Sequence, residues 1–180
     1  MVKAVEHRGA TPSQPPVGKI PDLAGDIRHL IPKLGLRNYW YPVITKRSVP
    51  KRHPVQVRML GEELCLFRGS QGQAVAIRDI CPHRGARPSE GTCHWKGTVT
   101  CPYHGWTFDE HGKNVAVLSE GPDSKICGKP GTEAYVYPTR EMKGIVFAWI
   151  GDTEPAPIEE DVPEEFFDST THLMYTDHTY

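Results

Sequence analysis

Apolar positions along the first 37 residues follow two different patterns. Residues 1–19 are rich in proline, glycine, serine and charge, and are predicted to form a mobile arm because they bury too little apolar surface to fold. After them, apolar side chains recur at helical spacing, at Leu23, Ile27, Leu30 and Ile31. Pro32 ends this pattern. Residues 20–37 are therefore predicted to hold a short N-terminal helix and a lead-in.

From residue 38 to residue 151 the pattern changes to short runs of β-branched and aromatic residues separated by turn formers. It predicts strands at 39–44, 55–60, 63–68, 74–79, 98–100, 106–108, 115–118, 134–140 and 144–150. The first four are expected to form an antiparallel meander, and the last two to be joined by a turn at residues 141–143. Short, regularly spaced strands without intervening helices predict an all-β sandwich or small barrel.

The last stretch, residues 152–180, is acidic and proline-rich at first, with eight acids and no base between residues 152 and 168. Its final ten residues resemble a strand that has no partner after it. We predict an acidic linker followed by the start of a further domain. By contrast, residues 1–60 carry eleven Lys or Arg and three acids, so the two ends of the chain are expected to present different faces.

Composition narrows the class of protein further. With 180 residues, 38% hydrophobic and 24% charged residues, the chain is expected to bury an ordinary globular core. A net charge of −1 gives no indication of a nucleic-acid partner. No run of eighteen apolar residues and no signal peptide is present, so we predict a cytoplasmic protein without a membrane partner. Five cysteines, an odd number, favour reduced thiols over a disulfide framework.

Two short motifs carry the candidate chemistry. The first is Cys81-Pro82-His83-Arg84-Gly85, and the second is Cys101-Pro102-Tyr103-His104-Gly105-Trp106. Each motif offers one thiolate and one imidazole, and each is predicted to lie on a turn that directly follows a strand. The candidate ligands are Cys81, His83, Cys101 and His104.

A 2Fe-2S cluster of Rieske type needs two thiolates on one iron and two imidazoles on the other, which is the stoichiometry of these motifs. A structural zinc ion is the alternative, because zinc also accepts two cysteines and two histidines. Zinc sites more often take a pair of ligands as Cys-x-x-Cys, whereas here each pair is mixed. The spacing therefore favours the cluster.

The two motifs resemble the Rieske domain of the Rieske non-haem iron oxygenases, and within that family the carbazole dioxygenase and oxoquinoline monooxygenase group. The resemblance covers residues 38–151 and implies a Rieske-type antiparallel β-sandwich with two cluster-binding loops. It places five further residues beside the cluster: Arg84, Gly85, Tyr103, Gly105 and Trp106. By resemblance, the domain passes NAD(P)H-derived electrons to a mononuclear iron that activates O2 on an aromatic or heterocyclic substrate.

The resemblance also implies partners and a missing site. A ferredoxin or a reductase is the expected electron donor. Because complementary charge steers electron-transfer encounters, Lys46, Arg47, Lys51 and Arg52 are a candidate docking patch for it. The family usually forms homotrimers. Its mononuclear iron is held by two histidines and a carboxylate. Asp26 and His29 have the spacing of the first two ligands, but no histidine follows at the required distance, and His172, Asp177 and His178 lack the spacing. That iron is expected only in a downstream domain.

Two further expectations concern the cluster itself. Rieske proteins of the respiratory chain carry an extra cysteine in each loop and two hydroxyl donors to sulfur, but the matching positions here hold Ala86, Tyr103, Trp106 and Phe108. We therefore predict a cluster of low potential. The alternative function is a standalone Rieske ferredoxin, which would not need the arm, the helix and the acidic tail.

Overall fold

The structure, a computed structural model, describes residues 36–171. The arm predicted at residues 1–19, the helix predicted between Leu23 and Ile31, and residues 172–180 lie outside the described residues. Between residues 36 and 171 the chain forms mainly antiparallel strands, which confirms the all-β prediction. The strands are β1 (Tyr39–Thr45), β2 (Val55–Met59), β3 (Glu62–Arg68), β4 (Ala74–Arg78), β5 (Thr98–Thr100), β6 (Trp106–Asp109), β7 (Asn114–Val117), β8 (Val136–Tyr137), β9 (Thr139–Met142) and β10 (Ile145–Ile150).

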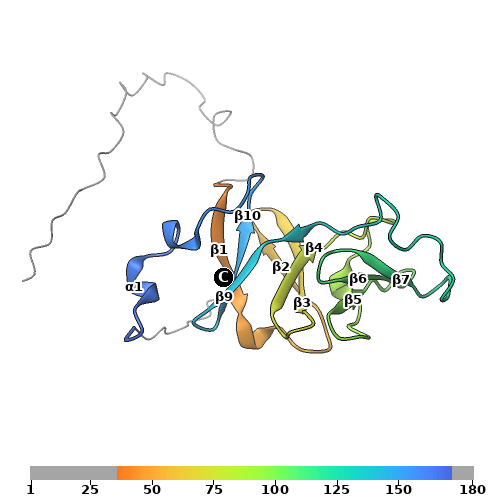
Figure 1. Cartoon of the computed structure of the whole chain (residues 1–180), viewed down its shortest axis with the longest axis horizontal. Coiled ribbons are helices and arrows are strands. Elements are labelled where there is room, and N and C mark those ends of the chain that lie inside the picture. The colour runs from red at the N-terminus through yellow and green to blue at the C-terminus, as the bar shows by residue number, and fades with distance from the viewer. Residues whose placement is uncertain (1–35, 172–180) are drawn as a thin grey trace, which may run out of the picture. The chain divides into compact units, whose positions relative to one another are not determined.

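Three antiparallel sheets make up this part of the chain (Figure 1). Their strand orders are β1-β10-β9, β2-β3-β4-β8 and β5-β6-β7. The four-stranded sheet lies between the other two, because apolar side chains from both of its faces are buried. The fold is therefore layered, with β3 and β4 at its centre.

Alternate residues of β3 and β4 point to opposite faces of the central sheet. One set packs in a core shared with β10: Leu64, Leu66, Ala74 and Ala76. The other set packs in a core shared with β5, β6 and β7: Cys65, Phe67, Val75 and Ile77. Since both faces are covered, these strands are apolar almost throughout instead of alternating with polar residues. The second core also contains Cys81 and Cys101.

The predicted meander of four strands is wrong at its first member. Strands β2, β3 and β4 do follow one another across a sheet, but β1 pairs with β10, so that Tyr39 lies opposite Ile150. The pairing is extended by the amide of Asn38, which donates to the carbonyl of Ile150 at 2.7 Å. The two ends of the predicted Rieske domain, residues 38–151, therefore lie side by side.

The predicted strand at 134–140 is divided by Pro138, which has no N–H to donate to a neighbouring strand. Before the proline, β8 pairs with β4, and after it β9 pairs with β10, so the chain passes here from the central sheet to the β1-β10-β9 sheet. The turn between β9 and β10 is Lys143-Gly144, with φ of 44° and 79°, and not the predicted 141–143. Positive φ at both positions is typical of a tight two-residue hairpin turn.

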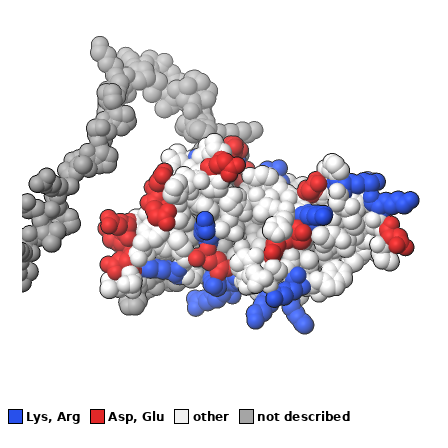
Figure 2. Space-filling model, in the orientation of Figure 1, with Lys and Arg blue, Asp and Glu red and all other residues white. Residues whose placement is uncertain are grey.

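Charges are unevenly distributed over the described part of the surface. Figure 2 shows Lys and Arg side chains gathered along the lower edge of the face in view, and Asp and Glu side chains at the end that carries α1 (Glu164–Phe167). Five basic residues line one hollow between the 3-10 helix η2 (Lys46–Ser48), the β3–β4 turn and the segment before β5: Lys46, Arg47, Lys51, Arg68 and Lys96.

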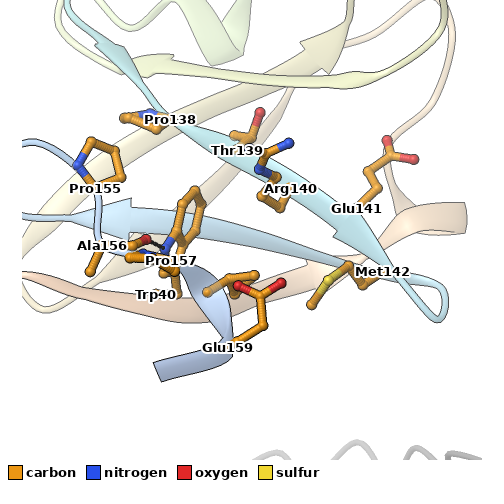
Figure 3. Close-up of a pocket in the computed structure, with 11 residues that line it drawn as sticks. Trp40, Pro138, Thr139, Arg140, Glu141, Met142, Pro155, Ala156, Pro157 and Glu159 are labelled. Carbon is orange, nitrogen blue, oxygen red and sulfur yellow. Dashed lines mark hydrogen bonds between the residues drawn. The ribbon is translucent and has the colours of Figure 1, made fainter. Parts of the chain in front are cut away.

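Part of the acidic segment after residue 151 packs on the outer face of the β1-β10-β9 sheet (Figure 3). The indole N–H of Trp40 donates to the carbonyl of Ala156 at 2.8 Å, and the backbone N–H of Trp40 donates to the Asp161 carboxylate at 2.7 Å. Ile158 and Val162 are buried against Trp149 in the same place. No helix among residues 36–171 has the length and apolarity needed to cross a membrane.

Candidate metal centre

Two strands deliver the two motifs to the same core. Cys81 lies three residues beyond the end of β4, and Cys101 directly follows β5. Both cysteines are buried, with 2% and 1% of their surface exposed, and they lie in the core between the central sheet and the β5-β6-β7 sheet. The positions of both sulfur-bearing residues are thus fixed by packed strands.

The two loops share one backbone frame. In each, the N–H of the cysteine donates to the carbonyl five residues later, and the N–H four residues later donates back to the carbonyl of the cysteine. These bonds measure 2.8 and 2.8 Å in the loop at Cys81, and 2.8 and 3.1 Å in the loop at Cys101. The residue four positions after each cysteine is glycine. Gly85 has a φ of 73° and Gly105 a φ of 69°, a conformation that a residue with a side chain rarely adopts.

The histidines occupy different places in this shared frame. His83 comes two residues after its cysteine and His104 three residues after its own. Nevertheless the two imidazoles face each other, with ring centroids 4.7 Å apart and planes inclined by 68°. Both imidazoles are half-buried, whereas both cysteines are buried. The four predicted ligands are therefore brought together, with the sulfur atoms on the inner side.

The two thiols lie within hydrogen-bonding reach of each other. The hydrogen bond between them raises the pKa of Cys81 and lowers the pKa of Cys101. Backbone N–H groups also stabilise each thiolate, those of His83 and Arg84 at Cys81, and those of Tyr103 and His104 at Cys101. The thiolate form, which is the form that binds metals, is thus favoured at Cys101, and the N–H donors would stabilise both sulfurs as thiolates when a metal is bound.

One buried atom of the site has no partner. The Nδ1 atom of His104 is buried and has no hydrogen bond within the described part of the chain. A buried polar atom left unpaired costs roughly 1–3 kcal/mol, so a metal bound at this position would remove a penalty. Residues 36–171 contain no group of three or more His, Cys, Asp and Glu that could hold a single ion. A 2Fe-2S cluster needs two protein ligands at each iron, and two adjacent pairs fit that requirement.

Aromatic rings cover both imidazoles. Trp106 of the second loop stacks on His83 of the first, with ring centroids 4.9 Å apart and planes within 1° of parallel. Tyr103 lies over His104 with centroids 4.0 Å apart. Trp106 is buried, while Tyr103 is 60% exposed. The buried tryptophan thus ties the two loops together, and the tyrosine covers the site from the solvent side.

The remaining predicted neighbours of the site differ in their surroundings. A Cβ atom at Gly105 would lie 2.4 Å from the Cβ of Leu118, so the second loop needs glycine for close packing as well as for its φ. A Cβ atom at Gly85 would meet nothing within 4 Å. Arg84 is exposed on the same loop. The glycine of the second loop is therefore packed against Leu118, whereas the glycine of the first loop faces open space.

The sequence interpretation missed the group that holds the first loop. Asp79, assigned to the end of a predicted strand, is buried with 1% of its surface exposed, and its carboxylate accepts two hydrogen bonds from Ser89. A strand pattern gives no sign of this, because a terminal aspartate ordinarily faces solvent. The position of Asp79 two residues before Cys81 was the only available signal.

Three residues of the predicted docking patch lie away from the loops. Lys46, Arg47 and Lys51 line the hollow beside the β3–β4 turn, where β4 begins, and Lys96 lines it where β5 is about to begin. Both strands run from this hollow towards a cysteine, and the five residues of β4 span roughly 16 Å. Lys46, Arg47 and Lys51 are thus at the opposite end of these strands from the cysteine loops. The carbonyl of Arg52, by contrast, accepts the N–H of Cys93, which lies between the two motifs, at 3.1 Å, so the docking role of the patch stays a prediction.

Comparison with known proteins identifies the domain. Residues 39–126 match the family model described as Rieske [2Fe-2S] domain. The chain is 41% identical over 138 residues to the terminal oxygenase component of carbazole 1,9a-dioxygenase from a Sphingomonas species, a match that covers 76% of this chain and 35% of that protein.

Solved structures give the same result. The terminal oxygenase of carbazole 1,9a-dioxygenase from Nocardioides aromaticivorans IC177 matches with a TM-score of 0.73 and 42% identity, over 82% of this chain and 40% of the other. The reduced complex between oxygenase and ferredoxin in carbazole 1,9a-dioxygenase matches with a TM-score of 0.67 and 37% identity, over 76% and 35%. The chain therefore spans well under half the length of these relatives.

Proposed function

Because the chain belongs to the Rieske non-haem iron oxygenase family, whose Rieske domain it carries, we propose that it is the electron-transfer domain of a ring-hydroxylating oxygenase. The observation that supports this most directly is the pair of loops with one backbone frame, which bring two buried thiols and two facing imidazoles together. In this proposal Cys81 and Cys101 bind one iron, and His83 and His104 bind the other.

When bound, the cluster supplies a one-electron carrier with a midpoint potential in a window of roughly −150 to +300 mV. Where the midpoint potential lies within that window depends on the groups that surround the sulfur atoms of Cys81 and Cys101. The donors that stabilise the thiolates are backbone N–H groups, and the neighbouring side chains of Ala86, Trp106 and Phe108 carry no hydroxyl. With the negative charge on sulfur only partly compensated, we expect a midpoint towards the low end.

The residues around the site give it an inner and an outer side. Cys81, Cys101 and Trp106 are buried and keep water from the sulfur side, whereas the imidazoles are half-buried and reach the surface. In this proposal electrons enter and leave through the histidines. The exposed ring of Tyr103 and the exposed Arg84 border that outer side and are the residues that a redox partner would meet first.

The rest of the enzyme is part of the same proposal. We expect a longer chain in which residues 38–151 are the Rieske domain and residues 152–180 lead to a catalytic domain that holds a mononuclear iron. Electrons derived from NAD(P)H would arrive through a ferredoxin, as the solved oxygenase–ferredoxin complex supports, and through a reductase. A cytoplasmic homotrimer acting on an aromatic or heterocyclic compound completes this proposal.

A standalone Rieske ferredoxin is the second candidate. It would need the same four ligands and the same loops, so the site does not exclude it. The carbazole 1,9a-dioxygenase relatives described above are terminal oxygenase components, which favours the oxygenase. A gene that continues with a carboxylate–His–His pattern would support the oxygenase, and a purified full-length product that binds only two iron atoms per chain would contradict it.

The ligand assignment can be tested on the purified chain. Iron and acid-labile sulfide should be present at two of each per chain, with the EPR signal of a mixed His/Cys cluster after reduction. His83→Ala and His104→Ala should abolish that signal, because each removes one ligand of the outer iron. His111→Ala is the matched control, since His111 is exposed in the β6–β7 turn. Colourless protein with stoichiometric zinc would overturn the assignment.

A further inference from the structure

Asp79 is the one charged side chain that is buried within residues 36–171. Its Oδ1 atom accepts the backbone N–H of Ser89 at 2.8 Å, and its Oδ2 atom accepts the hydroxyl of Ser89 at 2.5 Å. Both carboxylate oxygens therefore act as acceptors, as in an ionised carboxylate. No Lys, Arg or His of the described residues forms an ion pair with it. The charge is compensated by hydrogen bonds alone.

This carboxylate closes the base of the first loop. The N–H of Asp79 donates to the carbonyl of Glu63 at 2.8 Å, which fixes the residue to β3. Ser89 belongs to the 3-10 helix η3 (Pro88–Glu90), which follows the loop that carries Cys81 and His83. The pair thus joins the two ends of the segment between residues 79 and 89, with the ligands in between.

The same segment continues to the second loop. Thr92, three residues after Ser89, pairs with Thr100, the residue directly before Cys101, through N–H···O bonds of 3.2 and 2.9 Å. Between them a Cβ atom at Gly91 would lie 1.8 Å from the carbonyl oxygen of Thr100, so the backbones are in close contact. A short path therefore leads from Asp79 through Ser89 and Thr92 to the strand that positions Cys101.

We propose that Asp79 is a positioning residue of the metal centre that sets the spacing of the two loops and whose buried negative charge holds the midpoint potential of the cluster down. The inference rests on the proposed function. An electron added to the cluster is repelled by a nearby negative charge, and a buried charge is screened less than an exposed one. Asp79 lies two residues from one thiolate ligand and is linked to the other through Ser89 and the pairing of Thr92 with Thr100.

The experiment is a redox titration of the iron-loaded full chain at one fixed pH. Asp79→Asn removes the charge and keeps the shape, so the midpoint should move in the positive direction. Ser89→Ala keeps the charge and removes one of its donors, so the midpoint should move in the negative direction. Loosening of the loop alone would not produce shifts of opposite sign. Glu110→Gln is the matched control, because Glu110 accepts the N–H and O–H of Ser70 in the same way at the other end of β6, and it should leave the midpoint unchanged.

An Asp79→Asn midpoint equal to that of Glu110→Gln would overturn the inference. If Asp79→Asn does not retain iron, Ser89→Ala decides, and an unchanged or positive shift in that variant would overturn it. The rate of iron loss to a chelator tests the positioning role separately: it should rise in both Asp79→Asn and Ser89→Ala and stay at the wild-type value in Glu110→Gln. Wild-type protein without a cluster would instead contradict the proposed function, so the two failures are distinguishable.

Discussion

Two carboxylate–serine pairs of the same chemistry lie at opposite ends of the β5-β6-β7 sheet. Asp79 accepts the N–H and O–H of Ser89 at 2.8 and 2.5 Å beside the cysteine loops. Glu110 accepts the N–H and O–H of Ser70 at 2.5 and 2.8 Å, where the β6–β7 turn meets the β3–β4 turn. The difference is burial, since Asp79 is 1% exposed and the side chain of Glu110 is 19% exposed.

Because of this difference in burial, the two carboxylate–serine pairs affect their surroundings differently. At Glu110, water and dissolved salt reach the carboxylate, so the pair joins two turns and its charge is partly screened. At Asp79, the protein surrounds the carboxylate, so the charge acts on its neighbours with little screening. Removing a carboxylate should therefore cost more at the cysteine end than at the far end.

The largest expected effect is on stability when each carboxylate is deleted. Asp79→Ala should lower the free energy of unfolding by about 2–4 kcal/mol, because it removes a buried carboxylate with its charge-assisted bonds and leaves the N–H and O–H of the half-buried Ser89 without that acceptor. Glu110→Ala should cost about 0.5–1.5 kcal/mol, because water replaces the carboxylate. Urea unfolding of the purified chain measures both. Equal costs at the two ends would show that burial does not separate the pairs.

A smaller effect is expected when only the hydroxyl is removed. Ser89→Ala should cost about 1–1.5 kcal/mol, since one donor to a buried carboxylate is lost while the backbone N–H remains. Ser70→Ala should cost about 0.5 kcal/mol, because the Glu110 carboxylate also accepts a hydrogen bond from the side-chain amide of Gln73. The same unfolding measurement applies, and a larger loss at Ser70 than at Ser89 would reverse the comparison.

The smallest effect concerns pH. The backbone N–H of Ser70 lowers the pKa of Glu110, and bonds from the hydroxyl of Ser70 and from Gln73 add to this. Since the folded-state pKa lies below the unfolded one, the ionised carboxylate stabilises the fold above its ordinary pKa of roughly 4.3 and loses that contribution as the pH falls through the folded value. The stability difference between wild type and Glu110→Gln should thus shrink by under about 1 kcal/mol between pH 7 and pH 3. A difference that grows on acidification would contradict the sign.

Much of the fold follows from local pattern, and the exceptions have physical reasons. The strands from β2 to β7 lie close to their predicted positions because turn formers bound each apolar run. The pairing of β1 with β10 could not be predicted, since residues more than a hundred positions apart carry no local signal for each other. Pro138 was visible as a residue without an N–H, but only the sheets show that the chain changes sheet there.

The candidate site shows the same division. The four ligands were predicted from the spacing of two motifs, because metal chemistry constrains residue type and order. The stacking of Trp106 on His83 joins different loops and depends on their relative placement. Asp79 was overlooked for a related reason: an aspartate at a strand end is ordinarily a surface residue, and its burial is created by the segment from Pro88 to Thr92 that folds over it.

The passage through Pro138 also determines how the domain transmits force. On one side, β8 is hydrogen-bonded to β4, the strand that leads to Cys81; on the other, β9 is hydrogen-bonded to β10, against which the segment after residue 151 packs. Proline fixes φ, so this junction offers little of the torsional freedom that a hinge needs. A displacement of the C-terminal segment would therefore be transmitted to the first cysteine loop through β10, β9, Pro138, β8 and β4. The two sheets would move together instead of sliding past each other.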